Sequence, residues 1–380
     1  MTWRVVLWGV VVALLGVGGL AAWQLRGAHV HKPGEVPLEP VSVAALREDV
    51  RALAGAAYQD SDGEAELVRL LEPDAAVAKL APRTARSAHE KAEQLVATLT
   101  ARRQAAAFVD WSRVDARLGS PLTAAATARA IAQDRAERQL YPLEVAALGV
   151  AALRSAGVPA LLAEVFAYAG ESRPIDPSGR FGYFAVFVPD ETGPRGRVYD
   201  AYLGRNQQPS PADYTVLNDA QAVGAALALR AIDALSNRLE LASAQRDAEA
   251  ALKLSPNSPC AHGVLASVLL TRGETEPGKA ELDKALALRP DAARRNNLAI
   301  HALARMDPMA AGRELGDTLK QYPEFAYARS TRAAANMMLM SYQVASDDLD
   351  LAEKADPQLA LVPQLRAQLR HDTSRDLILN

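Results

Sequence analysis

Four prolines in the last third of the chain recur at a nearly constant spacing. They are separated by 34, 33 and 34 residues and stand at Pro256, Pro290, Pro323 and Pro357. Each follows a stretch of apolar residues at helical spacing. Because proline cannot continue a helix, it is typical of the positions just beyond a helix end. A fixed period of this length predicts repeated helix–turn–helix units.

Small residues stand at matching positions before these prolines. Alanine lies five residues before three of them and twelve residues before three of them, at Ala251, Ala285, Ala352, Ala244, Ala311 and Ala345. Small side chains let two helices cross at close range. With the period, this pattern resembles the tetratricopeptide repeat (TPR), although Gly278 and Thr318 stand where alanine is expected. The resemblance implies an all-α solenoid of TPR repeats over 216–372, followed by a tail over 373–380.

The resemblance also implies a concave surface, built from the first helices of the repeats, that binds peptides or partner proteins. The residues expected on this surface are Gly263, Ser267, Asn296, Ile300, Tyr327, Ser330 and Met337, with Arg294 near its rim. An asparagine amide can pair with a ligand backbone in both directions. Two alternatives stay open: these are plain surface positions, or the array docks on the domain before it.

Residues 140–205 predict a small α+β core. The stretch "EVAALGVAALRSAGVPALLAEVFAY" (144–168) predicts a buried helix that ends at Ala156-Gly157-Val158-Pro159, followed by an extended apolar segment. The segments "YFAVFVP" (183–189) and "RVYDAYL" (197–203) predict two more strands. We therefore expect a sheet laid against one central helix.

A helix with this turn, then strands, then an Asp in "VYDAYLG" resembles the transglutaminase-like superfamily over roughly 110–210. The resemblance implies a Cys at the helix start, a His on the next strand and an Asp on the strand after it. These positions fall near Tyr141-Pro142-Leu143, on the strand that begins Phe181-Gly182-Tyr183, and at Asp200.

A Cys and a His are missing from the first two of these positions. The single cysteine is Cys260, in the repeat region, and no His occurs between His89 and His262. We interpret the domain as a pseudoenzyme with no catalytic residues, in which Asp200 accepts backbone N–H groups at a strand end. The alternative is a divergent hydrolase or ligand-binding protein that uses this cleft, whose candidate carboxylates are Glu144, buried and with a raised pKa, Glu164, Asp176 and Asp200.

The first 40 residues predict attachment to a membrane. "VVLWGVVVALLGVGGLAAW" (5–23) is 19 residues without a charge, long enough to cross a bilayer as a helix. We predict a head over 1–4, a single-pass transmembrane anchor over 5–25 and a Pro/Gly-rich tether over 26–40. The bulk of the protein is expected on the periplasmic side of a bacterial inner membrane. The alternatives are secretion after signal cleavage near Gly19-Leu20-Ala21, and a bulk on the cytoplasmic side.

Composition and motifs narrow the function further. A net charge of -3 gives no general attraction to nucleic acid. One cysteine allows neither an intramolecular disulfide nor a cysteine metal cluster, and the chain has no Walker, GxGxxG, HExxH or CxxC motif. No cofactor or metal is predicted. With a helical and transglutaminase-like region over 41–215 before the repeats, the sequence predicts a membrane-anchored, non-catalytic scaffold or adaptor that binds a protein or peptide partner in an envelope complex.

Overall fold

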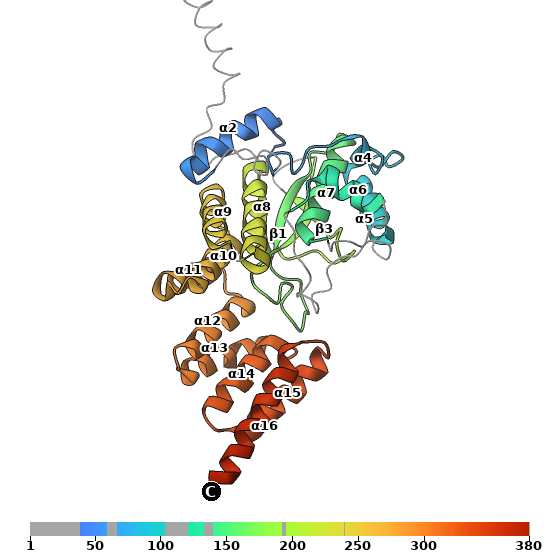
Figure 1. The fold of residues 1–380 in the computed structure, drawn as a ribbon. Helices are drawn as coiled ribbons and strands as arrows, with labels where there is room; N and C mark the ends of the chain where they lie inside the picture. Colours follow the sequence, from blue (N-terminus) through green and yellow to red (C-terminus); the bar gives the residue numbers. More distant parts are fainter. Residues whose placement is uncertain are drawn as a thin grey trace, which may run out of the picture. The chain divides into compact units, whose positions relative to one another are not determined.

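The computed structural model describes residues 39–58, 67–102, 121–132, 140–191, 195–238 and 240–379 (Figure 1). The chain divides into two units, Met1–Pro37 and Leu38–Asn380, and every described residue belongs to the second. The predicted head (1–4), anchor (5–25) and most of the tether (26–40) lie outside the described residues. Among the helices that the structure describes, none is both long and apolar enough to span a membrane.

A set of short helices opens the described chain. Ser42 caps the first of them by accepting a hydrogen bond from the Ala45 N–H, and Asp74 caps another by accepting from the Ala76 and Val77 N–H groups. Side-chain acceptors of this kind satisfy donors that a helix start leaves free. These helices are α2 (Val43–Ala54), the 3-10 turn η1 (Gly55–Ala57), α4 (Ala75–Ala78), α5 (Ala88–Arg102) and α6 (Ala124–Ala132).

The central helix α7 (Pro142–Ser155) lies where the sequence predicts a buried helix. Its first twelve residues are all buried, which explains why its sequence is apolar on every side. Pro142 opens the helix, and the side chain of Glu144 accepts a hydrogen bond from the Tyr141 N–H. The helix stops at Gly157, whose φ of 78° favours glycine.

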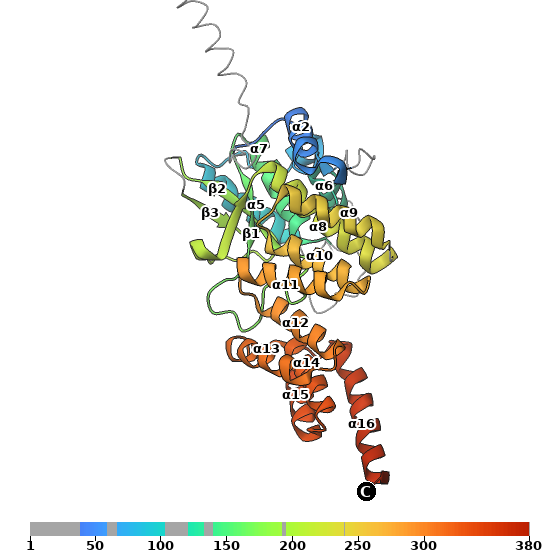
Figure 2. The same ribbon diagram turned by 90° about the vertical axis from the view of Figure 1, so that its left-hand side faces the viewer.

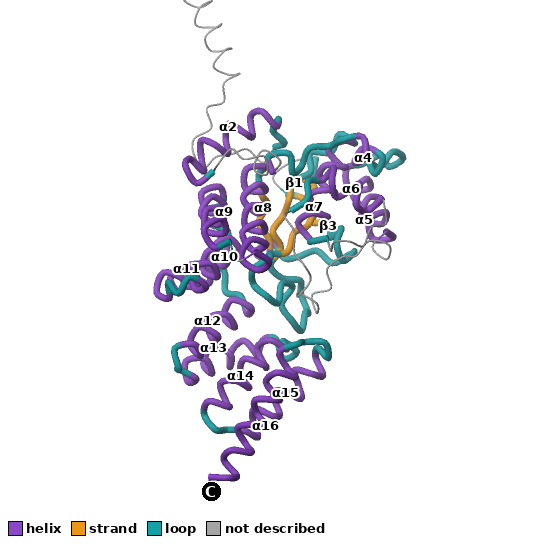
Figure 3. The backbone as a smooth tube through the Cα atoms, in the orientation of Figure 1, coloured by secondary structure: helices purple, strands orange, loops and turns teal. Residues whose placement is uncertain are grey.

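Four antiparallel strands follow in the spatial order β3-β2-β1-β4. Both faces of β1 are covered (Figure 3). Helix α7 packs against β1 and β2, and helix α8 packs against β1 and β4. The predicted strand over 197–203 ends at Tyr199, where the chain turns, and the last strand was not predicted. The strands are β1 (Leu161–Val165), β2 (Tyr183–Pro189), β3 (Gly196–Tyr199) and β4 (Tyr214–Leu217).

The rest of the described chain is all helical, as predicted (Figure 2). Four helix pairs follow one another, and each of the four periodic prolines lies two residues beyond the end of a second helix. The short turn η3 (Pro211–Asp213) precedes β4, and the π-helical turn η4 (Ala234–Arg238) follows α8. The pairs are α8 (Asp219–Asp233) with α9 (Leu241–Leu254), α10 (Pro259–Thr271) with α11 (Thr275–Leu288), α12 (Ala292–Ala304) with α13 (Pro308–Gln321), and α14 (Ala326–Met338) with α15 (Tyr342–Ala355), before the final α16 (Leu361–Leu379).

Small residues explain how closely these helices pack. The six periodic alanines are fully buried. At Gly278, an added Cβ would lie 2.7 Å from Leu270 Cγ, so this site has even less room than alanine requires. The core of the sheet continues into α8, α9 and α10, across the boundary predicted between 215 and 216. The first helix pair therefore shares its core with the sheet.

One close approach of helix to sheet gives a test of this packing. A Cβ added to Gly149 on α7 would lie 2.7 Å from Val186 Cγ2 on β2, whereas one added to Gly312 on α13 would meet nothing within 4 Å. We expect Gly149→Ala to lower the free energy of unfolding by about 1–2 kcal/mol through overpacking. Gly312→Ala should raise it by about 0.5–1 kcal/mol through helix propensity. Urea denaturation followed by circular dichroism measures both, and shifts of the same sign would contradict this packing.

Candidate functional site

Strands β2 and β3 bring together two of the three positions that the transglutaminase-like resemblance marks. The hydroxyl of Tyr183 donates to the carboxylate of Asp200, 2.9 Å from Oδ1 and 2.8 Å from Oδ2. Both side chains are buried. Burial and the nearby Asp200 charge hold the pKa of Tyr183 well above its usual range. The neutral phenol of Tyr183 thus lies on the strand where the resemblance implies an imidazole base.

Asp200 is also a structural acceptor at a strand end, as predicted. Its Oδ1 accepts hydrogen bonds from the backbone N–H groups of Tyr202 (3.0 Å) and Leu203 (2.8 Å), just after β3. Arg205 Nε lies 3.7 Å from the other oxygen, Oδ2. Burial raises the pKa of Asp200, and the Leu203 N–H and the Tyr183 hydroxyl oppose that rise. With these donors in place, the carboxylate is engaged in holding the turn after β3.

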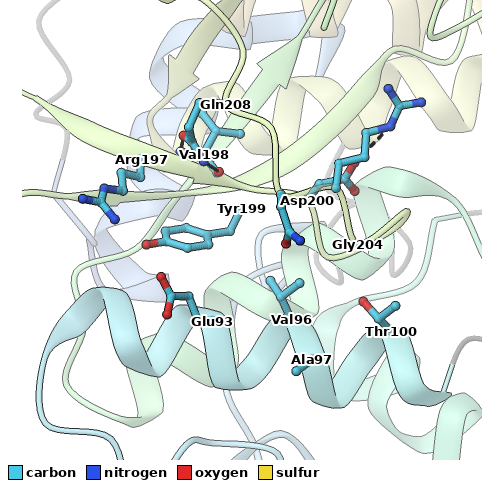
Figure 4. Close-up of a pocket in the computed structure, with 12 residues that line it drawn as sticks. Glu93, Val96, Ala97, Thr100, Arg197, Val198, Tyr199, Asp200, Gly204 and Gln208 are labelled. Atoms are coloured by element: carbon cyan, nitrogen blue, oxygen red, sulfur yellow. Dashed lines mark hydrogen bonds and ion pairs between the residues drawn. The ribbon is translucent and has the colours of Figure 1, made fainter.

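A cavity of about 570 Å³ lies beside this turn, between α5 and β3 (Figure 4). Glu93 and Thr100 reach it from α5, Arg197 and Tyr199 from β3, and Asp200 lies at its wall. The cavity therefore has charges of both signs, but the Asp200 carboxylate beside it faces donors of its own turn. We see no nucleophile paired with a base among the residues that line it.

A histidine that the sequence did not mark as a candidate lies next to this cavity. His89, at the start of α5, has Nδ1 2.9 Å from the Tyr199 hydroxyl and Nε2 2.9 Å from Asp190 Oδ1. Burial raises the pKa of Tyr199, so its phenol stays neutral and is a poor nucleophile. No sequence signal reveals this contact, because 110 residues separate His89 from Tyr199.

The remaining candidate carboxylates are held by structural donors or by burial. Glu144 is buried, as predicted, and accepts from the N–H groups of Leu122 and Tyr141. Asp176 accepts four hydrogen bonds, from the N–H and hydroxyl of Ser178 and from the N–H groups of Phe181 and Gly182. Glu164 lies 3.4 Å from the Ser258 hydroxyl, and burial raises its pKa to about 7 against the opposing charge of Arg294.

The residues predicted for the concave surface of the array differ in how far they are exposed. Ile300 is exposed, and Ser267 and Tyr327 are half-buried. The others are buried: Gly263, Arg294, Asn296, Ser330 and Met337. The placement of Arg294 near a rim was wrong, because only 4% of this residue is exposed and the backbone at Gly179 lies over it.

The segment between β1 and β2 explains the burial of Gly263 and Arg294, because it packs against α10 and α12. Asn297 donates to the Ser178 carbonyl at 3.1 Å, and the Cys260 thiol lies 3.1 Å from the Arg180 carbonyl. Cβ atoms added at Gly179 and Gly263 would lie 3.2 Å from Ala293 Cβ and 3.1 Å from the Gly179 carbonyl oxygen, respectively. Part of the array thus docks on the preceding domain, which is the alternative that the sequence left open.

Beside this contact the same helices leave a second cavity, of about 390 Å³. Two of the predicted residues, Ser267 and Ile300, line it. On α12 its amide is Asn297 and not the predicted Asn296, whose side chain is buried and whose Oδ1 has no hydrogen-bond partner among the described residues. Arg180 enters the cavity from the segment between β1 and β2, which repeat periodicity cannot reveal.

Neither a search for metal-ligand groups nor comparisons with known proteins assign a metal site or a family to the described residues. Within the described ranges, no group of three or more His, Cys, Asp and Glu side chains is arranged to hold a metal ion. A scan against models of protein families gives no match to this chain, and a search among curated proteins finds no similar sequence. The geometry of the two cavities is therefore the basis for assigning a function.

The raised pKa of Glu164 predicts a specific dependence of stability on pH. Between its ordinary pKa of 4.5 and the value of about 7 in the folded protein, the folded state keeps a proton that the unfolded state loses. Stability from this group is therefore present below pH 4.5 and is lost as the pH rises to 7. Glu164→Gln should remove the loss and be more stable than the parent at pH 8 by roughly 3 kcal/mol, with little difference at pH 4.5.

Urea denaturation of the parent and of Glu164→Gln at several pH values between 4.5 and 8 measures this effect. Other titrating groups are common to both proteins, so the difference between them reports on Glu164. A constant difference across this range would contradict a raised pKa at this site.

Proposed function

We propose that this protein is a non-catalytic scaffold that binds a peptide or protein partner on the concave side of its helix pairs. The observation that carries the proposal is the cavity of about 390 Å³ formed by α10, α12 and Arg180. Its volume is within the range of typical ligand sites, and polar or charged side chains line it together with the apolar side chains of Leu270, Ile300 and Ala304. The 34-residue period and the buried small residues support a tetratricopeptide-type array.

We also propose that the α+β core is a transglutaminase-like domain that has kept its fold and lost its catalytic Cys and His. The resemblance to transglutaminase-like proteins would put a thiol near Tyr141-Pro142-Leu143, an imidazole on the strand that begins Phe181-Gly182-Tyr183, and a carboxylate at Asp200. The hydrogen bonds from Tyr183 to Asp200 support a structural use of these positions. The proposed attachment is a single membrane anchor over 5–25, with the described part on the periplasmic side of a bacterial envelope.

A substitution that fills the cavity tests this function. Ala304 is exposed on α12 and lines the cavity, so Ala304→Trp should block it without disturbing the core. Ala280→Trp is a matched control, because Ala280 is exposed on α11 and does not line the cavity. The full-length parent and both variants are captured from detergent-solubilised membranes, and copurifying proteins are quantified by mass spectrometry.

We expect a stoichiometric partner with the parent and with Ala280→Trp, and a loss of at least about tenfold with Ala304→Trp, because the bulky ring excludes the partner's anchoring group. A partner retained equally by both variants would move binding away from this surface. A parent protein that captures nothing would overturn the scaffold proposal.

A further inference from the structure

Arg180 brings a positive charge into the cavity of α10 and α12 without an evident counter-ion. Its Nε is buried and has no hydrogen-bond partner among the residues that the structure describes. Burial lowers the pKa of Arg180, while the charge of Asp176 opposes this. Asp176 cannot serve as a close partner, because its oxygens accept from Ser178 and from the N–H groups of Phe181 and Gly182. Arg180 is half-buried, and because a guanidinium stays charged, taking part of it out of water without a partner is costly.

The rest of the cavity is also lined by groups that suit an anion. None of its lining residues carries a carboxylate; their polar side chains are those of Arg180, Ser267, Thr271, Thr275, Asn297, His301 and Arg305. His301 is 6% exposed, and its Nε2 has no partner among the described residues. Burial and the charge of Arg305 lower the pKa of His301, so its ring is neutral at pH 7 and can donate from one nitrogen.

We propose that this cavity binds a carboxylate group of the peptide partner, with Arg180 as its counter-ion. This inference rests on the proposed scaffold function and names the chemistry of its ligand. A guanidinium pairs with a carboxylate through two parallel hydrogen bonds. Leu270, Ile300 and Ala304 supply an apolar wall beside the charge, which suits an aliphatic group next to the carboxylate.

The charge balance favours a carboxylate over a phosphate group. Arg305, the second arginine at the cavity, forms an ion pair with Glu276, and His301 is neutral. One unpaired cation therefore faces the ligand, which matches a single negative charge better than the larger charge of a phosphate group. Because Arg180 comes from the segment between β1 and β2, the binding site needs the α+β core as well as the helix pairs.

Matched small molecules test the chemistry on the full-length protein. N-acetyl-L-leucine has a terminal carboxylate, N-acetyl-L-leucinamide is its neutral counterpart, and N-acetyl-L-glutamic acid α-amide has its carboxylate on the side chain. Binding is followed by the NMR signals of the His301 ring, with inorganic phosphate titrated in parallel. We expect at least one carboxylate to bind with a Kd on the order of 1 mM, and the neutral amide at least about tenfold more weakly.

Each outcome of these titrations decides the proposal. Tighter binding of the leucine derivative supports a chain terminus as the ligand, and tighter binding of the glutamic acid derivative supports an acidic side chain. Equal binding of acid and neutral amide, no binding of either carboxylate, or tighter binding of phosphate would overturn the proposal.

Substitution of the arginine separates a binding role from a structural one. We expect Arg180→Gln to weaken carboxylate binding at least about tenfold. It should also raise the melting temperature of the ligand-free protein, because it removes a half-buried charge whose Nε has no partner among the described residues. Arg313→Gln is the control, since Arg313 is exposed on α13 and does not line the cavity. A lower melting temperature for Arg180→Gln would make Arg180 a structural residue and overturn the proposal. A protein partner that is lost with Ala304→Trp and still captured by Arg180→Gln would leave the scaffold function in place and overturn the proposed binding of a carboxylate.

Discussion

The buried carboxylate of Asp176 organises the contact on which the proposed binding site depends. It accepts from Ser178 and from the N–H groups of Phe181 and Gly182, and so it folds the segment between β1 and β2 back on itself. Hydrogen bonds to the charged form favour that form against the cost of burial. The fold of this segment sets Gly179 against α12 and brings Arg180 to the cavity.

This arrangement links the α+β core and the helix pairs through direct packing contacts. The α+β core has no activated nucleophile at the positions that the transglutaminase-like pattern marks, and Tyr183 and Asp200 stabilise the start of β2 and the end of β3. Its contribution is instead a segment that covers one part of the helix pairs and completes a cavity on another part. The α+β core thus shapes a cavity that the helix pairs alone would not have.

Local signals in the sequence predicted several of the helices and strands. Contacts between distant segments determine which residues line the cavities. The proline period predicted the ends of four helices, and the apolar stretch with its Gly157 turn predicted α7. The strand β4 was missed because it is short and half-exposed. The choice of Asn296 was one residue from Asn297, which turns a side chain by about 100° around a helix. Arg180 was missed because its place depends on tertiary packing across more than 80 residues.

Hydrogen exchange at the Phe181 and Gly182 amides tests most directly whether this segment is held against the helices. Both N–H groups donate to the buried Asp176 carboxylate, at 3.0 and 2.9 Å. We predict that they exchange as slowly as the amides of the buried strand β2, because both need the same core to open, and that Asp176→Asn removes this protection. Exchange at the rate of an exposed turn in the parent protein would contradict a docked segment, and with it the binding site that we propose.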